Sequence, residues 1–386
     1  MSSGRLERKR YFSWYNHWSQ GKSDTALSPR TQASKVASTR SKRALWTSGQ
    51  LSGKPWPSTQ AGTFTAARNA SVVSKLLSDD HKAGFFASTK EEYERVRARH
   101  YKKGPRSSLI SIEDARANAF NVNFDDYTPK KPNKLGVTVL DNLDLNEVRN
   151  YIDWTPFFTT WQLSGKYPLI LKHEVVGEEA TKLFNDANEI LDIIEKTGKI
   201  KAKGVFGLFA AASEEDDVIV YADEARTEEI TRLHHLRQQS EKKSGQYNRC
   251  LSDYLASTDS GVQDYLGAFA VTAGFGADEW SEEFLAEHDD YNSILVKAVA
   301  DRLAEAFAEY LHERVRKDYW GYAADEQLAN EDLIREKYQG IRPAPGYAAC
   351  PEHTEKKRMW DLLDVEKRIG MSLTESCAMW PGASVS

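Results

Sequence analysis

The chain has 386 residues, enough for two or three domains of ordinary size, and its 40% apolar content can fill their cores. That composition excludes a collagen-like or wholly disordered chain. The net charge of −5 is too small to favour nucleic acid or a membrane surface as a partner. Three widely spaced cysteines without a C-x-x-C motif are typical of reduced thiols, and the longest nearly apolar run, 205–212, is far short of a membrane helix. We therefore expect a cytoplasmic protein.

The first 68 residues differ in composition from the rest. They contain twelve basic and two acidic residues, a net charge of +10 that leaves −15 for the remaining chain. Their tryptophans are scattered, and no helical or strand periodicity is present. This pattern predicts a disordered or non-native tail, with an RNA-binding arm as the less favoured alternative. The acidic remainder should repel polyanions.

Helical patterns dominate residues 69–200. Apolar residues at 72, 73, 76 and 77 have helical spacing, and Ser88 begins an S-T-K-E sequence typical of a capping box, which predicts a helix over 91–101. Residues 106–140 are expected to form a wrapping linker that contains a short helix over 112–120. Further helices are predicted over 146–151 and 178–197.

Strand patterns follow. The apolar or β-branched runs 204–212 and 217–222, joined by an acidic turn, indicate a β-hairpin, and 266–272 indicates a third strand. A long helix is predicted over 291–317 from an apolar stripe. Strands joined by a tight turn, with helices grouped around them, favour an α+β fold with an antiparallel sheet.

Two patterns resemble parts of well-known sites. Ala273-Gly-Phe-Gly-Ala lies between a strand and a helix, as in nucleotide-binding Rossmann units, but lacks the third glycine. A turn made by two glycines is favoured, and a free-standing Rossmann-type methyltransferase stays open as an alternative. His234-His235 and Cys350-x-x-His353 could each supply half of a metal site, yet neither has its second half, so no metal site is predicted.

Residues 341–347, Ile-Arg-Pro-Ala-Pro-Gly-Tyr, form the most unusual stretch. Two prolines fix the backbone, and Gly346 lets a ligand approach it. Arg342 can hold a carboxylate with two hydrogen bonds, Tyr347 can cover a ring, and the carbonyl of Ala344 is an available acceptor. The stretch therefore suggests a rigid clamp for a small molecule, and a purely structural turn is an equally weighted alternative.

Two carboxylates adjoin apolar residues. Asp153 precedes Trp-Thr-Pro-Phe-Phe, where it would be unfavourable unless it pairs with a cation or caps a helix. Glu305 lies among apolar residues of the long predicted helix, where a solvated face is the default interpretation. Both are candidates for binding a cationic ligand.

Several motifs occur in a characteristic order: Asp153-Trp-Thr-Pro-Phe-Phe, His234-His-Leu-Arg-Gln-Gln, His288-Asp-Asp-Tyr-Asn and Arg342-Pro-Ala-Pro-Gly-Tyr. In this order they closely resemble the activation module of cobalamin-dependent methionine synthases. The resemblance extends from about residue 69 to residue 386. Residues 69–103 are similar to the end of the preceding cobalamin-binding module and 104–386 to the activation domain, whereas 1–68 match nothing in the family.

The resemblance implies a bent antiparallel sheet with surrounding helices. It also implies binding of S-adenosylmethionine, the methyl donor that returns inactive cob(II)alamin to use after flavodoxin or a similar reductase supplies an electron. The full enzyme makes methionine from homocysteine, and its cobalamin would be held by a module absent from this chain. Asp153, Glu305, Arg342, Ala344, Gly346 and Tyr347 are the expected ligand contacts, and no catalytic residue of the protein is needed. The family's sequence continues beyond residue 386, which suggests a C-terminally truncated fragment, and a non-catalytic interaction domain remains an alternative.

Overall fold

The computed structural model describes residues 75–102, 108–124, 127–141 and 143–386. The described residues from 111 to 386 belong to one compact unit, and helix α5, Asp79–Lys102, belongs to another. The predicted tail, 1–68, lies outside the described residues. Within the described ranges, no helix has the length and apolarity that crossing a bilayer requires.

Helix α5 begins earlier than predicted. It runs unbroken through Ser88, whose hydroxyl donates to the Phe85 carbonyl at 2.9 Å, as does that of Thr89 at 2.8 Å. Hydroxyls bonded to the carbonyl three or four residues back are found inside helices and do not cap a new one. The prediction that a helix starts after Ser88 is therefore wrong.

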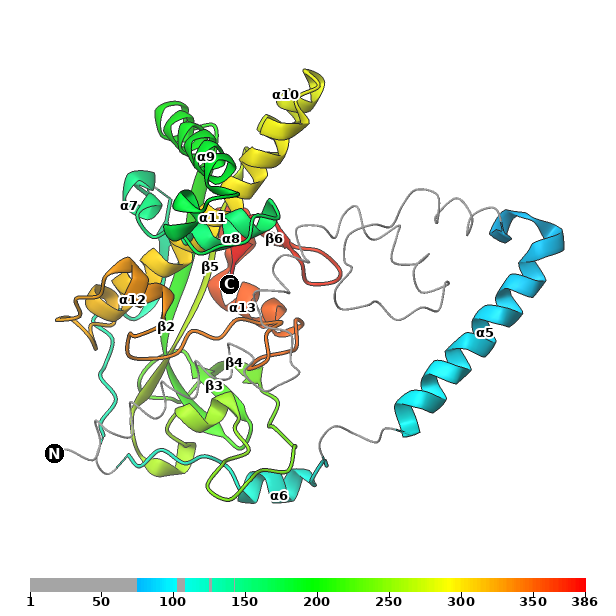
Figure 1. Ribbon diagram of the computed structural model, residues 1–386. Helices are drawn as coiled ribbons and strands as arrows, with labels where there is room; N and C mark the ends of the chain where they lie inside the picture. Colours follow the sequence, from blue (N-terminus) through cyan, green and yellow to red (C-terminus); the bar gives the residue numbers. More distant parts are fainter. Residues whose placement is uncertain (1–74, 103–107, 125–126, 142) are drawn as a thin grey trace. The chain divides into compact units, whose positions relative to one another are not determined.

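One antiparallel sheet organises residues 111–386 (Figure 1). The strand order is β4-β3-β2-β5-β8. Strand β1 pairs with residues 204–208 of β2, and β3 pairs with residues 211–214 of the same strand. The bounds are β1 Gly136–Leu140, β2 Lys201–Glu214, β3 Asp217–Tyr221, β4 Glu229–His234, β5 Asp264–Phe275 and β8 Ser384–Val385. The hairpin of β2 and β3 and the third strand β5 were predicted, and the α+β fold with an antiparallel sheet is confirmed.

The glycine-containing turn after β5 has a structural cause. Gly276 adopts φ +89°, and a Cβ there would lie 2.0 Å from the Lys199 carbonyl oxygen. Strand β5 is antiparallel to both β2 and β8, whereas a Rossmann unit requires parallel strands. The alternative of a Rossmann-type methyltransferase is therefore wrong.

Strand β2 is buried on both faces, which explains its nearly continuous apolar sequence. Phe206 and Leu208 face one cluster of buried side chains, and Val205 and Phe209 face the other. The second cluster is completed by α13, Glu355–Leu363, and α14, Val365–Ile369. The Phe307 ring packs against Gly204. A Cβ at position 204 would lie only 2.8 Å from this ring, so a residue with a side chain would not fit there.

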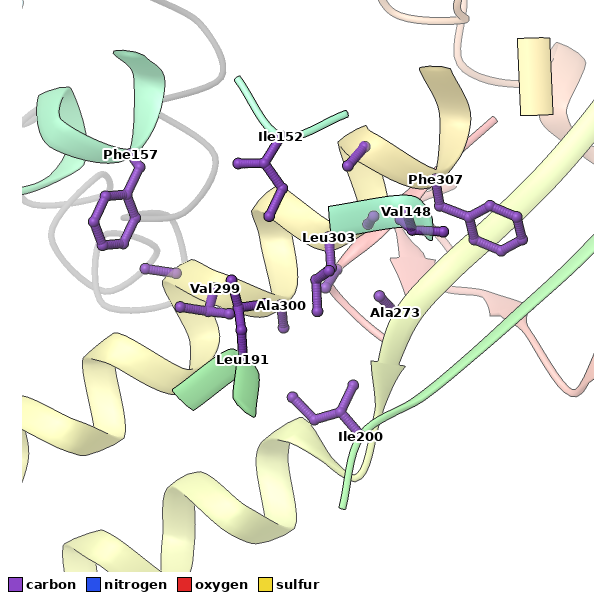
Figure 2. Packing of buried hydrophobic residues seen from close by; sticks show 14 of the residues in the cluster. Val148, Ile152, Phe157, Leu191, Ile200, Ala273, Val299, Ala300, Leu303 and Phe307 are labelled. Carbon is purple, nitrogen blue, oxygen red and sulfur yellow. The ribbon is translucent and has the colours of Figure 1, made fainter. Parts of the chain in front are cut away.

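Helices of the first cluster surround the long helix α11. Figure 2 shows Val299 of this helix next to Leu191, and Leu303 and Phe307 further along it on the side of Ala273 of β5. The helices on this side of the sheet are α7 Leu145–Arg149, α8 Trp154–Thr160, α9 Gly177–Thr197, α10 Ala277–Ala286 and α11 Asp290–Arg314. The long helix predicted over 291–317 is confirmed, and it corresponds to α11. Helix α11 continues into a π-helical turn, Val315–Tyr319.

Short elements complete the unit. They are helices α6 Ile112–Ala117 and α12 Asn330–Ile334, 3-10 turns Leu169–Lys172, Leu251–Tyr254 and Thr258–Ser260, and the strands β6 Ser372–Leu373 and β7 Met379–Trp380, which pair as a hairpin. The segment after α6 wraps the unit as expected. Asn118 binds the Asn248 side chain at 2.7 Å, and Asn133 binds the Asp318 carbonyl at 2.8 Å.

A buried ion cluster fixes the end of the β2–β3 hairpin. Arg237, from the His-His-Leu-Arg motif, has a side chain only 3% exposed and binds Asp253 through two nitrogens, at 2.6 and 3.0 Å. It also binds Asp216 at 2.6 Å and the Asn248 carbonyl at 2.8 Å. The motif therefore has a structural role, because removal of one partner from such a buried cluster leaves a charge without compensation.

Replacing this arginine tests that role. We expect Arg237→Ala to lower the free energy of unfolding by about 3 to 5 kcal/mol, since it leaves the buried Asp253 carboxylate unpaired. The control is Arg232→Ala on β4, whose ion pairs with Glu214 and Glu229 are partly exposed and should contribute less than about 1 kcal/mol. Urea denaturation of both variants is the measurement, and equal losses would contradict the assignment.

Candidate functional site

The stretch 342–347, here called the proline turn, lies beside the polar face of α11. Arg342 forms an ion pair with Glu309. Burial, followed by the positive charge of Arg342, lowers the pKa of His312 one turn further along the helix. Burial, followed by the charge of Glu305, raises the pKa of the Tyr347 phenol. The structure thus brings Arg342, Tyr347 and Glu305 together, although they are separated by up to 42 positions in the sequence.

Glu309 anchors the guanidinium of Arg342. Its carboxylate is 16% exposed; one oxygen accepts from Arg342 Nη2, and the buried Oε2 has no hydrogen-bond partner within the described ranges. A partly buried carboxylate fixes an arginine more firmly than an exposed one, because desolvation strengthens the charge-assisted bond. The arginine of the turn is therefore oriented by α11 without a ligand.

The approach to the turn is anchored as well. Arg316, fully buried in the π-helical turn, binds both oxygens of Glu326, with a shortest distance of 2.6 Å. Its guanidinium lies 4.3 Å from the centre of the Tyr338 ring. The rings of Tyr338 and His312 are nearly perpendicular, and their centres are 4.7 Å apart. Because Glu326 and Tyr338 precede the proline turn, these contacts tie the chain leading into it to the end of α11.

Backbone hydrogen bonds close the proline turn. Tyr347 N donates to Ala344 O at 3.2 Å, Gly346 N donates to Cys350 O at 2.7 Å, and Cys350 N donates to Tyr347 O at 3.0 Å. The Ala344 carbonyl is thus already an acceptor within the turn, contrary to the expectation that it is available, and only its second lone pair remains for a ligand. The main chain is nevertheless held in one conformation.

Gly346 is required for a reason that sequence alone did not provide. It adopts φ +99°, and a Cβ at this position would lie 2.1 Å from Cε1 of the His353 ring. The imidazole therefore occupies the space over the glycine. This close packing needs no ligand, so glycine at 346 is explained by the fold itself.

Asp153 caps helix α8. One carboxylate oxygen accepts from Thr155 N at 3.0 Å, and the residue has an extended backbone, as N-cap residues do. The capping alternative is confirmed. The following Trp154, Phe157 and Phe158 are buried in the core against α11, which explains the aromatic residues of this motif.

Glu305 is exposed on α11, as the default interpretation predicted, and Asp301 lies one turn before it. Burial raises the pKa of Asp301 to about 6, with Glu305 adding to the shift and Arg302 opposing it. Asp301, Glu305 and Glu309 recur every four residues, so they form a row of carboxylates along the helix face near the proline turn. A row of this kind favours a cation.

Sequence reasoning missed Glu309 and the pair His353 and Lys356. The four-residue spacing from Glu305 is a signal that could have identified Glu309. Cys350-x-x-His353 was examined as half of a metal site, but His353 Nδ1 lies 3.1 Å from Lys356 Nζ instead. Among the described residues, no group of three or more histidine, cysteine or acidic side chains is placed to hold a metal ion.

Residues 144–386 match the family model described as vitamin B12 dependent methionine synthase, activation domain. The chain belongs to this family. Within the activation domain, the match includes the α8 cap, helix α11 and the proline turn. A crystal structure of the MetH reactivation domain bound to AdoHcy is similar to this chain, with a TM-score of 0.71 and 58% sequence identity. The alignment covers 72% of this chain and 85% of that chain.

The cap at Asp153 gives a prediction for the activation domain. Asp153→Ala should lower the free energy of unfolding by about 1 kcal/mol, whereas Asp153→Asn should change it by less than about 0.5 kcal/mol because asparagine also accepts from Thr155 N. Asp144, which caps α7 by accepting from Asn146 N at 2.9 Å, is the matched control, and its alanine and asparagine variants should show the same difference as those of Asp153. Urea denaturation is the measurement, and an Asp153→Asn variant as unstable as Asp153→Ala would show that more than the cap is lost.

Proposed function

We propose that this activation domain binds S-adenosylmethionine at the proline turn and presents it as the methyl donor for reactivation of the enzyme's cobalamin. The observation that carries the proposal is the arrangement of Arg342, held by Glu309, beside Glu305 and the 40% exposed Tyr347. S-adenosylmethionine carries a carboxylate, an ammonium, a sulfonium and an aromatic base. The site offers a group of matching chemistry for each of them.

Each expected contact has a physical rationale. The Arg342 guanidinium has five donors, so it can bind a ligand carboxylate while Glu309 accepts from Nη2. Glu305 carries a negative charge for the ammonium or sulfonium, and the phenol ring of Tyr347 can cover the base or attract a cation. The second lone pair of the Ala344 carbonyl and the main-chain carbonyl of Gly346 can supply the remaining polar contacts.

Asp153 already has a structural contact, because one of its carboxylate oxygens accepts from Thr155 N of its own helix. One oxygen serves as the cap, and the second leaves capacity for a ligand cation. We propose it as a ligand contact because the motif Asp153-Trp-Thr-Pro-Phe-Phe resembles that of the family. The cap-preserving Asp153→Asn change separates the two roles, since only a ligand contact would make it weaken binding.

The chemistry requires little from the protein beyond position and charge. The sulfonium is an activated methyl donor, and loss of its methyl group leaves the neutral thioether S-adenosylhomocysteine. Cobalamin supplies the nucleophilic metal that accepts the methyl group, and we propose that a separate module holds it. The side chains described above bind and orient the donor, so no acid, base or nucleophile of this chain is needed.

The proposal extends to the organisation of the enzyme. We assign residues 104–386 to the activation domain and 69–103 to the end of the cobalamin-binding module, and the compact unit beginning at Ser111 supports the first assignment. Flavodoxin or a similar reductase is the proposed electron donor, and synthesis of methionine from homocysteine is the proposed overall reaction. Three buried free thiols support a reducing, cytoplasmic environment.

Isothermal titration with S-adenosylmethionine and S-adenosylhomocysteine tests the proposal directly. Saturable binding of both, with one ligand per chain, is the expected result. A non-catalytic interaction domain would bind neither ligand, and that outcome would overturn the proposed function.

Arg342→Ala should weaken binding of S-adenosylhomocysteine by roughly 2 to 4 kcal/mol, because a charge-assisted bond to the ligand carboxylate is lost. Arg342→Lys should recover little of the loss, since an ammonium cannot reproduce the planar fork. The alanine change also leaves Glu309 unpaired, so the double variant Arg342→Ala/Glu309→Gln separates lost ligand contacts from a disturbed helix. The control is Arg314→Ala, which removes an exposed ion pair on α11. If the titration gives the same affinity for Arg342→Ala as for the unaltered chain, this arginine is not part of the site.

Glu305→Gln discriminates between the two cations of the ligand. S-adenosylhomocysteine lacks the sulfonium charge and keeps the ammonium. If Glu305 faces the ammonium, both ligands should lose affinity equally, by about tenfold, as expected for loss of one partly exposed charge interaction. A loss confined to S-adenosylmethionine would instead place it at the sulfonium, and unchanged binding of both would exclude Glu305.

A further inference from the structure

Lys356 is a buried lysine that forms no ion pair with a carboxylate among the residues that the structure describes. It lies in the first turn of α13 and is 5% exposed, and its ammonium contacts His353 Nδ1 at 3.1 Å and the Cys377 carbonyl at 3.4 Å. Both of these contacts are to neutral acceptors, an imidazole nitrogen and a main-chain carbonyl. Burial lowers the pKa of its side chain, because the charged form loses its hydration there. A lysine placed only for stability would be poorly chosen here.

The acceptor of this ammonium packs directly on the proline turn. The His353 ring occupies the position over Gly346, where a Cβ would lie 2.1 Å from Cε1 and 2.6 Å from Nε2. Three groups are therefore in contact one after another: the Gly346 backbone, the imidazole and the ammonium. A shift of the ring is transmitted to the turn, because close-packed groups leave no space to absorb it.

The other contact of Lys356 reaches the C-terminal hairpin. Cys377 lies in the turn between β6 and β7, where its N donates to Thr374 O at 2.8 Å. The hairpin leads into β8, which pairs with β5 in the main sheet. In the same helical turn, Glu355 accepts from His234 N on β4 at 3.0 Å. The start of α13 thus links the proline turn to the hairpin and to the sheet.

We propose that Lys356 is a positioning residue for the adenosyl ligand: its side-chain nitrogen holds the His353 ring against Gly346 and thereby fixes the ligand-binding conformation of the proline turn. This inference rests on the proposed function of that turn. Lys356 itself touches the turn only through His353. Its role is consequently to restrict the turn to one conformation, which reduces the ordering cost of binding.

Lys356→Met tests the inference, because methionine has a similar length and no charge. Thermal denaturation should give an unchanged or higher melting temperature, since a buried ammonium is removed. Titration with S-adenosylhomocysteine should show affinity lowered at least about tenfold. The neighbouring exposed Lys357→Met is the matched control and should change neither quantity. Affinity within twofold of the unaltered chain would overturn the inference.

A double-variant cycle tests whether the ammonium acts through the imidazole. His353→Phe keeps a ring over Gly346 and removes the acceptor, so it should weaken binding by itself. In that background, Lys356→Met should have no further effect on affinity. Additive losses would overturn the proposed route through His353.

Nuclear magnetic resonance supplies a readout that a purely structural role would not move. Lys356 contributes to lowering the pKa of His353, with burial as the larger cause and Glu352 opposing both. The pKa of His353 should therefore rise in Lys356→Met, and the Gly346 amide resonance should shift. Unchanged values for both would contradict this arrangement. Failure of the unaltered chain to bind either adenosyl ligand would refute the proposed function, whereas normal binding by both the unaltered chain and Lys356→Met would refute this inference alone.

Discussion

The packing of α11 against the sheet is the constraint on which the rest of the domain depends. Leu303 and Phe307 are almost fully buried, and the Phe307 ring fits only because Gly204 of β2 has no side chain. With that face committed to the core, polar residues of the same helix can occupy only the opposite face. Glu305 and Glu309 therefore lie where the proline turn meets the helix, and the position of the site follows from the packing of the core.

Buried arginines then determine the path of the irregular segments. Arg237 fixes the end of the hairpin through Asp253 and Asp216, and Arg316 fixes the chain after α11 through Glu326. Such clusters contribute little net stability compared with apolar packing, but a wrong arrangement would leave charges without partners. They therefore select one loop conformation among many, which a site built on loops requires.

The sequence predicted what is decided locally. The apolar run at 204–212, the stripe of α11 and the amphipathic pattern of α9 each contain enough periodicity to identify their element, and the antiparallel sheet follows from the hairpin. Contacts between distant residues could not be predicted in this way. The pairing of Arg342 with Glu309 spans 33 positions, and the packing of His353 on Gly346 depends on how the chain folds back after the turn. At Ser88 a local pattern was misleading, because a serine inside a helix can satisfy its hydroxyl with the preceding turn just as a cap satisfies the backbone.

The ion pair of Arg342 with Glu309 bears on how the site discriminates between ligands. The guanidinium is neutralised on one side by a carboxylate that is itself largely buried, so the turn does not present an uncompensated positive charge. A simple anion would gain little by approaching Arg342, because the adjacent Glu305 and Glu309 repel it. A zwitterion is different, since its carboxylate can bind the arginine while its cation is attracted by the acidic row. In the proposed site, the carboxylates that orient the arginine also disfavour ligands that carry only negative charge, so an amino-acid group joined to a sulfonium fits the proposal better than a phosphate or a simple acid does.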